Sequence, residues 1–159
     1  MWIQNVSMGD IIKGNHRQDD LDHTVLIQIQ DFGAWQFARP LHQEIFHKIH
    51  QFRFEDCEEE FKSSIQDEQA AELVKILQEA LANKHNVLVH CHAGICRSGA
   101  VAEVGTILGF EEPDRGRIPN LLVKHKMMKV LGLTYDSDEI RSDDPRMYDR
   151  WQNFDMRKM

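Results

Sequence analysis

One short segment of the chain places a cysteine between an apolar strand and an apolar helix. The segment reads His90-Cys91-His92-Ala93-Gly94-Ile95-Cys96-Arg97-Ser98. It follows the apolar run Val87–Val89 and precedes a second apolar run, Val101–Leu108. Where a strand passes through a tight loop into a helix, unpaired backbone N–H groups form a concave site for an anion. The segment therefore predicts a strand, loop and helix that together bind an oxyanion such as phosphate.

Three residues of this segment suit anion chemistry. Gly94 tolerates positive φ and lets the backbone approach a ligand closely. Arg97 supplies a planar fork of donors that matches two phosphate oxygens. A thiol at a helix N-terminus beside an arginine loses its proton more easily than a free thiol, so we expect Cys91 to be a nucleophilic thiolate at neutral pH. The expected phosphate ligands are His92, Ala93, Gly94, Ile95, Cys96 and Arg97.

The pattern His-Cys-(five residues)-Arg-Ser, with glycine three residues after the cysteine, resembles the signature loop of the cysteine-dependent protein tyrosine phosphatases. The resemblance is to the compact dual-specificity-like enzymes and their small prokaryotic relatives. It implies hydrolysis of phosphate monoesters, foremost phosphotyrosine on proteins and additionally phosphoserine or phosphothreonine, through a phosphocysteine at Cys91. It also implies that Ser98 helps the sulfur depart, that His90 orients the loop from a buried position, and that His92 faces solvent.

This reaction needs a carboxyl group that first protonates the leaving oxygen and then activates water. In the enzymes that the chain resembles, the acid lies in a loop after a strand, and Asp56 in the run Phe52–Cys57 matches that place. The sequence leaves Glu55, Glu58 and Asp67 open as alternatives. A solvated acidic loop without a catalytic role is also left open.

Five further positions carry weaker signals. Asn120 follows Pro119 and resembles a Pro-Asn pair that hydrogen-bonds the phosphate loop; a polar helix start away from the site is the alternative. Cys57 and Cys96 are interpreted either as partners in a reversible disulfide that protects Cys91, or as buried small residues. Trp35 and Phe37 are expected to pack half-buried, with a place at the mouth of the pocket as the alternative.

Composition limits the remaining function classes. The chain has 159 residues, a net charge of −7 and three cysteines. It fits one domain over residues 1–159 in a reducing, cytoplasmic compartment, with no membrane span and no nucleic-acid surface. We expect a monomer that acts on a phosphorylated protein or peptide. No cofactor or metal is expected, because His42, His47 and His50 do not have ligand spacing.

Alternating strands and helices predict an α/β fold with a central, mostly parallel sheet of four or five strands. The expected strands cover Met1–Val6, Thr24–Ile29, Gln51–Glu55 and the run at Val87–Val89. The expected helices cover Leu41–His50, Asp67–Lys84, Arg97–Leu108, a segment from Pro119 to Gly132, and Pro145–Asp155. Ser7–Lys13 is predicted as a loop or as a single turn of helix.

The sequence leaves two rival functions open. The first is a phosphate-binding pseudophosphatase or interaction module, which would keep the anion loop but lack a competent acid. The second keeps the nucleophile and changes the substrate or the reaction: an RNA 5′-phosphatase of the same fold, or a sulfur transferase or arsenate reductase. The spacing from Cys91 to Arg97 and the following Ser98 favour phosphoryl chemistry over sulfur transfer.

Overall fold

The computed structural model describes residues 1–133, and four parallel strands form its central sheet. The strands are β1 (Ile3–Ser7), β2 (Thr24–Gln30), β3 (Lys48–Arg53) and β4 (Asn86–Cys91), in the order β1-β4-β2-β3. This confirms the predicted α/β fold. Because all the strands run the same way, their carboxyl ends meet at one edge, where Cys91 pairs in register with Ser7.

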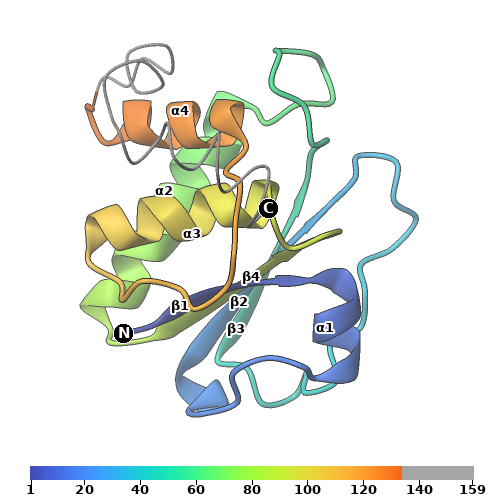
Figure 1. Ribbon diagram of the computed structural model, residues 1–159, viewed down its shortest axis with the longest axis vertical. Helices are drawn as coiled ribbons and strands as arrows, with labels where there is room; N and C mark the ends of the chain where they lie inside the picture. Colours follow the sequence, from blue (N-terminus) through green and yellow to red (C-terminus); the bar gives the residue numbers. More distant parts are fainter. Residues whose placement is uncertain (134–159) are drawn as a thin grey trace.

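Helices cover both faces of this sheet (Figure 1). Helices α2 (Asp67–Ala82) and α3 (Arg97–Leu108) lie on one face, with α4 (Leu121–Val130) packed over them, and the short α1 (Met8–Lys13) lies on the other. The residues of β2 and β4 are buried throughout. Burial on both faces explains why these strands read as continuous apolar runs in the sequence.

Local signals account for the ends of several helices. Ser7 caps α1 by accepting from the backbone N–H of Asp10, which forms a capping box, so the segment predicted as loop or one helical turn is helical. Asn120 caps α4 through Val123. The helix predicted to begin at Pro119 therefore begins two residues later, at Leu121, because Asn120 supplies the cap.

The predicted helix over Leu41–His50 is wrong. This segment forms turns and then enters β3 at Lys48. Its apolar residues have helical spacing, yet Leu41 and Ile45 are exposed and only Phe46 is buried. Parallel pairing with β2, which begins where Val25 faces Lys48, outweighs the helical pattern and also moves the third strand earlier than Gln51–Glu55.

Two further expectations concern the chain as a whole. The last predicted helix, Pro145–Asp155, lies outside the described residues. Over residues 1–133, none of the helices has both the length and the apolar character that crossing a membrane requires.

Candidate active site

The nucleophile expected from the sequence lies at the carboxyl end of β4. Cys91 is 2% exposed, and the backbone N–H of Gly94 donates to its Sγ over 3.3 Å. Ser98, in the first turn of α3, places its Oγ 3.2 Å from the same sulfur. The cysteine loop, defined as residues 91–97, thus directs a backbone N–H and a hydroxyl at one sulfur atom.

The cysteine loop is held tightly against β1. Gly94 has φ +77°, and a Cβ at this position would meet the carbonyl carbon of Val6 at 2.4 Å. The backbone N–H of Met8 donates to His92 O over 3.1 Å, and the amide of Asn5 donates to Gly94 O over 2.8 Å. Glycine is therefore required at position 94 for both its φ and its contact with the backbone.

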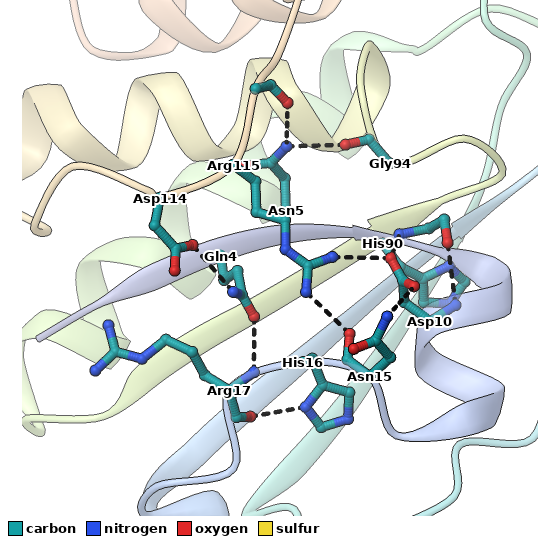
Figure 2. A network of polar contacts seen from close by, with 12 residues as sticks. Gln4, Asn5, Asp10, Asn15, His16, Arg17, His90, Gly94, Asp114 and Arg115 are labelled. Atoms are coloured by element: carbon teal, nitrogen blue, oxygen red, sulfur yellow. Dashed lines mark hydrogen bonds and ion pairs between the residues drawn. The ribbon is translucent and has the colours of Figure 1, made fainter.

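Polar contacts extend from the loop to its surroundings (Figure 2). Asn5 also donates to Gly116 O over 3.2 Å, which ties the cysteine loop to the segment between α3 and α4. In that segment Arg115 pairs with Asp10 of α1 at 2.9 Å and donates to Asn15 O. The loop is therefore braced by segments that are far apart in the sequence.

Arg97 is buried, with 4% of its side chain exposed, and two hydrogen bonds fix its guanidinium. Its Nη1 donates to Asp31 Oδ1 and to Phe54 O, each over 2.8 Å. Its Nε is also buried and has no hydrogen-bond partner among residues 1–133. An unpartnered buried donor is costly, so the free nitrogen points to an oxyanion ligand at this guanidinium. Sequence reasoning missed Asp31, although its place directly after a buried strand was a signal.

The acidic loop (Glu55–Glu60) follows β3 and is hydrogen-bonded to the start of α4. Asn120 donates from its side-chain amide to Asp56 Oδ1 over 2.8 Å and to Cys57 O over 3.1 Å. The carboxylate of Glu58 accepts from the backbone N–H of Leu121 over 2.7 Å. The backbone N–H of Asn120 donates to Cys96 O over 2.9 Å. Asn120 therefore connects the cysteine loop to Asp56, the residue predicted as the acid.

Of the other carboxylates considered as acids, Glu55 lines the pocket beside His92, whereas Asp67 lies at the start of α2. Glu55 accepts from the backbone N–H of Phe32, and Asp67 pairs with Lys126 at 2.8 Å. Asp56 itself is exposed. In the described part of the chain its carboxylate makes a hydrogen bond to Asn120 and none to Cys91 or Arg97.

The two histidines around the nucleophile differ in environment as expected. His90 is fully buried, and burial lowers its pKa to about 4; the nearby Arg97 acts in the same direction, while a hydrogen bond with Cys91 opposes it. His92 is exposed and lines a pocket of about 350 Å³ with Asp31 and Glu55. His90 is thus a neutral ring at pH 7.

The two remaining cysteines are free, as is Cys91. Burial raises the pKa of Cys96 to about 11, and the charges of Asp56, Cys91 and Glu58 add to this effect. Burial also raises the pKa of Cys57. Because the thiolate is the reactive form, neither thiol is primed to attack an oxidised Cys91.

The aromatic loop after β2 differs from expectation at one position. Trp35 is 92% exposed, so it is not half-buried as predicted. Phe37 is partly buried and lies under the guanidinium of Arg53, 4.5 Å from the ring centre. Gly33 and Ala34, rather than the aromatic residues, line the pocket beside His92.

A metal could find ligands at the other end of the sheet. Asp20, Asp22 and His23 place ligand atoms within 4.8 Å of one another, and all three residues are exposed. They lie before β2, at the edge opposite the cysteine loop. Exposed groups of this kind are common on protein surfaces, and no role is assigned to them.

Comparisons with known proteins bear on the fold. No protein-family model matches the chain, and no curated protein matches its sequence. The solved structure of the human tyrosine phosphatase-like serine/threonine/tyrosine-interacting protein is similar, with a TM-score of 0.56 and 18% identity over 82% of this chain and 91% of that protein. A tyrosine phosphatase from the Orf virus has a TM-score of 0.48 and 14% identity over 80% of this chain and 81% of the viral one. The likeness to the human protein shows that the two chains share a fold.

Proposed function

From this fold and the geometry around Cys91, we propose that the chain is a phosphatase that hydrolyses phosphate monoesters through a phosphocysteine. One observation carries the proposal. The same loop holds the Cys91 sulfur, which contacts the Gly94 N–H and the Ser98 hydroxyl, and the buried guanidinium of Arg97, whose Nε has no partner among the described residues. Both groups suit a tetrahedral dianion, one as the attacking atom and the other as a clamp on the equatorial oxygens.

Each step of the proposed reaction uses a named group. The Cys91 thiolate attacks phosphorus while the loop N–H groups and Arg97 hold the non-bridging oxygens. Asp56 protonates the leaving oxygen, and the Sγ–P bond forms as the P–O bond breaks. Asp56 then takes a proton from water, water attacks phosphorus, and the sulfur departs with Ser98 donating to it. Phosphate leaves and the thiolate is restored.

We propose an aryl phosphate, phosphotyrosine in proteins, as the leading substrate, with phosphoserine and phosphothreonine as additional ones. Two carboxylates, Asp31 and Glu55, line the pocket beside the cysteine loop. Further carboxylates follow in the acidic loop. These negative charges repel a polyanion, which counts against an RNA 5′ end as substrate.

A turnover assay with an aryl phosphate and a phosphotyrosine peptide tests the proposal. Wild type is expected to release phosphate, and Cys91→Ser is expected to abolish release because the hydroxyl is a far weaker nucleophile. Asp56→Asn should lower kcat by about 100-fold, the usual share of general acid catalysis. Glu59→Gln removes a carboxylate from the same loop without touching the proposed acid and is the matched control.

A second candidate function is a phosphate-binding interaction module. It is favoured by the exposed position of Asp56, whose carboxylate accepts from Asn120 and, among residues 1–133, makes no hydrogen bond to the cysteine loop. If the purified protein binds vanadate or phosphate yet releases no phosphate from either substrate, this candidate replaces the phosphatase.

A further inference from the structure

We propose that Gln28 is a positioning residue for the nucleophile: it fixes the tautomer of His90, and His90 in turn holds the carbonyl group of Cys91. The statement about the nucleophile rests on the proposed function. The statement about the tautomer rests on the fold alone and can be tested without any turnover.

The proposal starts from a chain of side-chain contacts across the sheet. Gln28 of β2 pairs in register with His90 of β4, and the two residues are 1% and 0% exposed. Their Nε2 atoms lie 3.2 Å apart. Beyond them, Gln51 of β3 donates to Gln28 Oε1 over 3.0 Å, and His90 Nδ1 lies 3.3 Å from Cys91 O. The chain thus runs across the sheet from β3 to the backbone of the cysteine loop.

The contact between Gln28 and Ala38 determines the direction of the hydrogen bonds in this series of side chains. The Nε2 of Gln28 lies 2.8 Å from Ala38 O, and a backbone carbonyl can only accept. The atom facing Ala38 is therefore the NH₂ group, which agrees with Gln28 Oε1 accepting from Gln51. The second hydrogen of this NH₂ group is directed to His90 Nε2. That ring nitrogen must then be the acceptor and carry no proton.

The other end of the chain requires the same tautomer independently. The atom opposite His90 Nδ1 is the carbonyl oxygen of Cys91, which can only accept. Nδ1 must therefore carry the proton. Carbonyl groups at both ends thus require a neutral ring that is protonated at Nδ1 and bare at Nε2.

The charge state of the ring agrees with this assignment. Burial lowers the pKa of His90 to about 4, and Arg97 is the charged group that acts on the ring. At neutral pH the ring has one proton to place, and without the Gln28 donor either nitrogen could hold it. A ring protonated at Nε2 would turn a bare Nδ1 towards Cys91 O and repel it.

The consequence for the nucleophile follows from peptide geometry. The carbonyl of Cys91 and the N–H of His92 belong to one planar trans peptide and point in opposite directions. When His90 holds the carbonyl, it also fixes the direction of that N–H at the start of the cysteine loop. Loss of the hydrogen bond frees this peptide to rotate beside the Cys91 sulfur.

The tautomer is tested directly by ¹⁵N NMR of the histidine side chains in wild-type protein between pH 5.5 and 8, a range chosen above the pKa of about 4. We expect His90, assigned by its loss in His90→Asn, to show a protonated Nδ1 and a bare Nε2 across the whole range. A protonated Nε2 overturns the proposal.

The effect on the nucleophile is tested by alkylating Cys91 with iodoacetamide and locating the product by mass spectrometry. Gln28→Met keeps the side-chain size and removes the donor; we expect alkylation of Cys91 at pH 6 to slow by about fivefold, the usual worth of one hydrogen bond. Gln30→Met is the matched control, because Gln30 is buried on the same strand and its side chain, within residues 1–133, hydrogen-bonds the backbone of residues 36 and 38 rather than His90.

Equal rates in the two methionine variants would overturn the positioning role. If Gln28→Met fails to fold, the NMR result on wild type still decides the tautomer. Both measurements remain readable when wild type hydrolyses no aryl phosphate, and that result counts against the proposed function alone.

Discussion

Arg97 and Asp31 form the ion pair at the centre of the candidate site. Asp31 contacts only Nη1 of the guanidinium, and the buried Nε stays unpartnered among residues 1–133. Asp31 therefore orients the arginine from the side and leaves another edge of the guanidinium to a ligand. If Asp31 competed with the phosphate, its carboxylate would bind the Nε edge of the guanidinium instead.

Asp31→Asn keeps the size of the side chain and removes its charge. We expect kcat/KM for an aryl phosphate to fall by about fivefold, less than a buried charged hydrogen bond would give, because Asp31 is 58% exposed. The matched control is Asp22→Asn, at the opposite edge of the sheet. A rise in kcat/KM would show that Asp31 blocks the phosphate site.

At this scale the sequence predicts neighbours better than distant partners. Cys91, Gly94, Arg97 and Ser98 lie within eight positions of one another, so one local pattern predicts their meeting. Asp31 and Arg97 are 66 positions apart, and only the pairing of β2 with β4 brings them together. No local pattern reports that pairing.

Asn120, at the start of helix α4, both stabilises the helix and contacts the candidate active site. The side-chain oxygen of Asn120 accepts from the N–H of Val123 and caps the helix, while its amide nitrogen donates to Asp56. The resemblance predicted a hydrogen bond from Asn120 to the phosphate loop. In the structure the backbone N–H of Asn120 makes the hydrogen bond to that loop, at Cys96 O, whereas its side-chain amide donates to Asp56 of the acidic loop.

Two substitutions separate these roles. Asn120→Ser keeps a capping oxygen but is too short to donate to Asp56, so we expect kcat to fall by about tenfold with nearly unchanged stability. Asn120→Ala loses both contacts, so the free energy of unfolding should also fall by about 1 kcal/mol. Urea unfolding and turnover assays check the pair. Equal losses of stability in the two variants would contradict the separation.

The prediction of elements succeeded where burial sets the pattern. β2 and β4 are apolar because both faces of the sheet are covered, and α2 shows its buried stripe in the sequence. The helix prediction for residues 41–50 failed because their helical spacing competes with an edge strand, β3, in which Phe52 is the one buried residue. An edge strand carries a weaker alternation, so the sequence alone favoured the helix.

Stability of the whole molecule should depend on His90. Its pKa is about 4 in the folded chain and near 6.5 in an unfolded one. Between these values the unfolded chain binds more protons, so the contribution of the neutral ring is complete above pH 6.5 and is lost as the pH falls towards 4. From pH 7 to pH 5 this amounts to about 2 kcal/mol.

Urea unfolding of wild type and His90→Asn at both pH values checks this expectation. The free energy of unfolding should fall more steeply in wild type, by about 2 kcal/mol over the same interval. The difference between the two proteins isolates His90 from the carboxylates and other histidines that also titrate. Parallel falls would mean that the ring is not held neutral by burial.

The sequence predicts the class of architecture of the whole molecule but not the order of its strands. Alternating strands and helices indicate a parallel sheet, and a parallel sheet places its functional loops at one edge. Which loops converge there depends on the strand order β1-β4-β2-β3, which the sequence does not reveal. That order sets β4 between β1 and β2, so that Asn5 and Gln28 flank the cysteine loop from either side.

The proposed reaction requires a covalent bond between phosphorus and the sulfur of Cys91. The most direct test is to denature the protein during turnover of a phosphotyrosine peptide and to locate any phosphoryl group by tandem mass spectrometry. We expect a phosphoryl group on Cys91 in wild type and none in Cys91→Ser. Phosphate release by wild type without any phosphoryl group on Cys91, or with one on another residue, would contradict it.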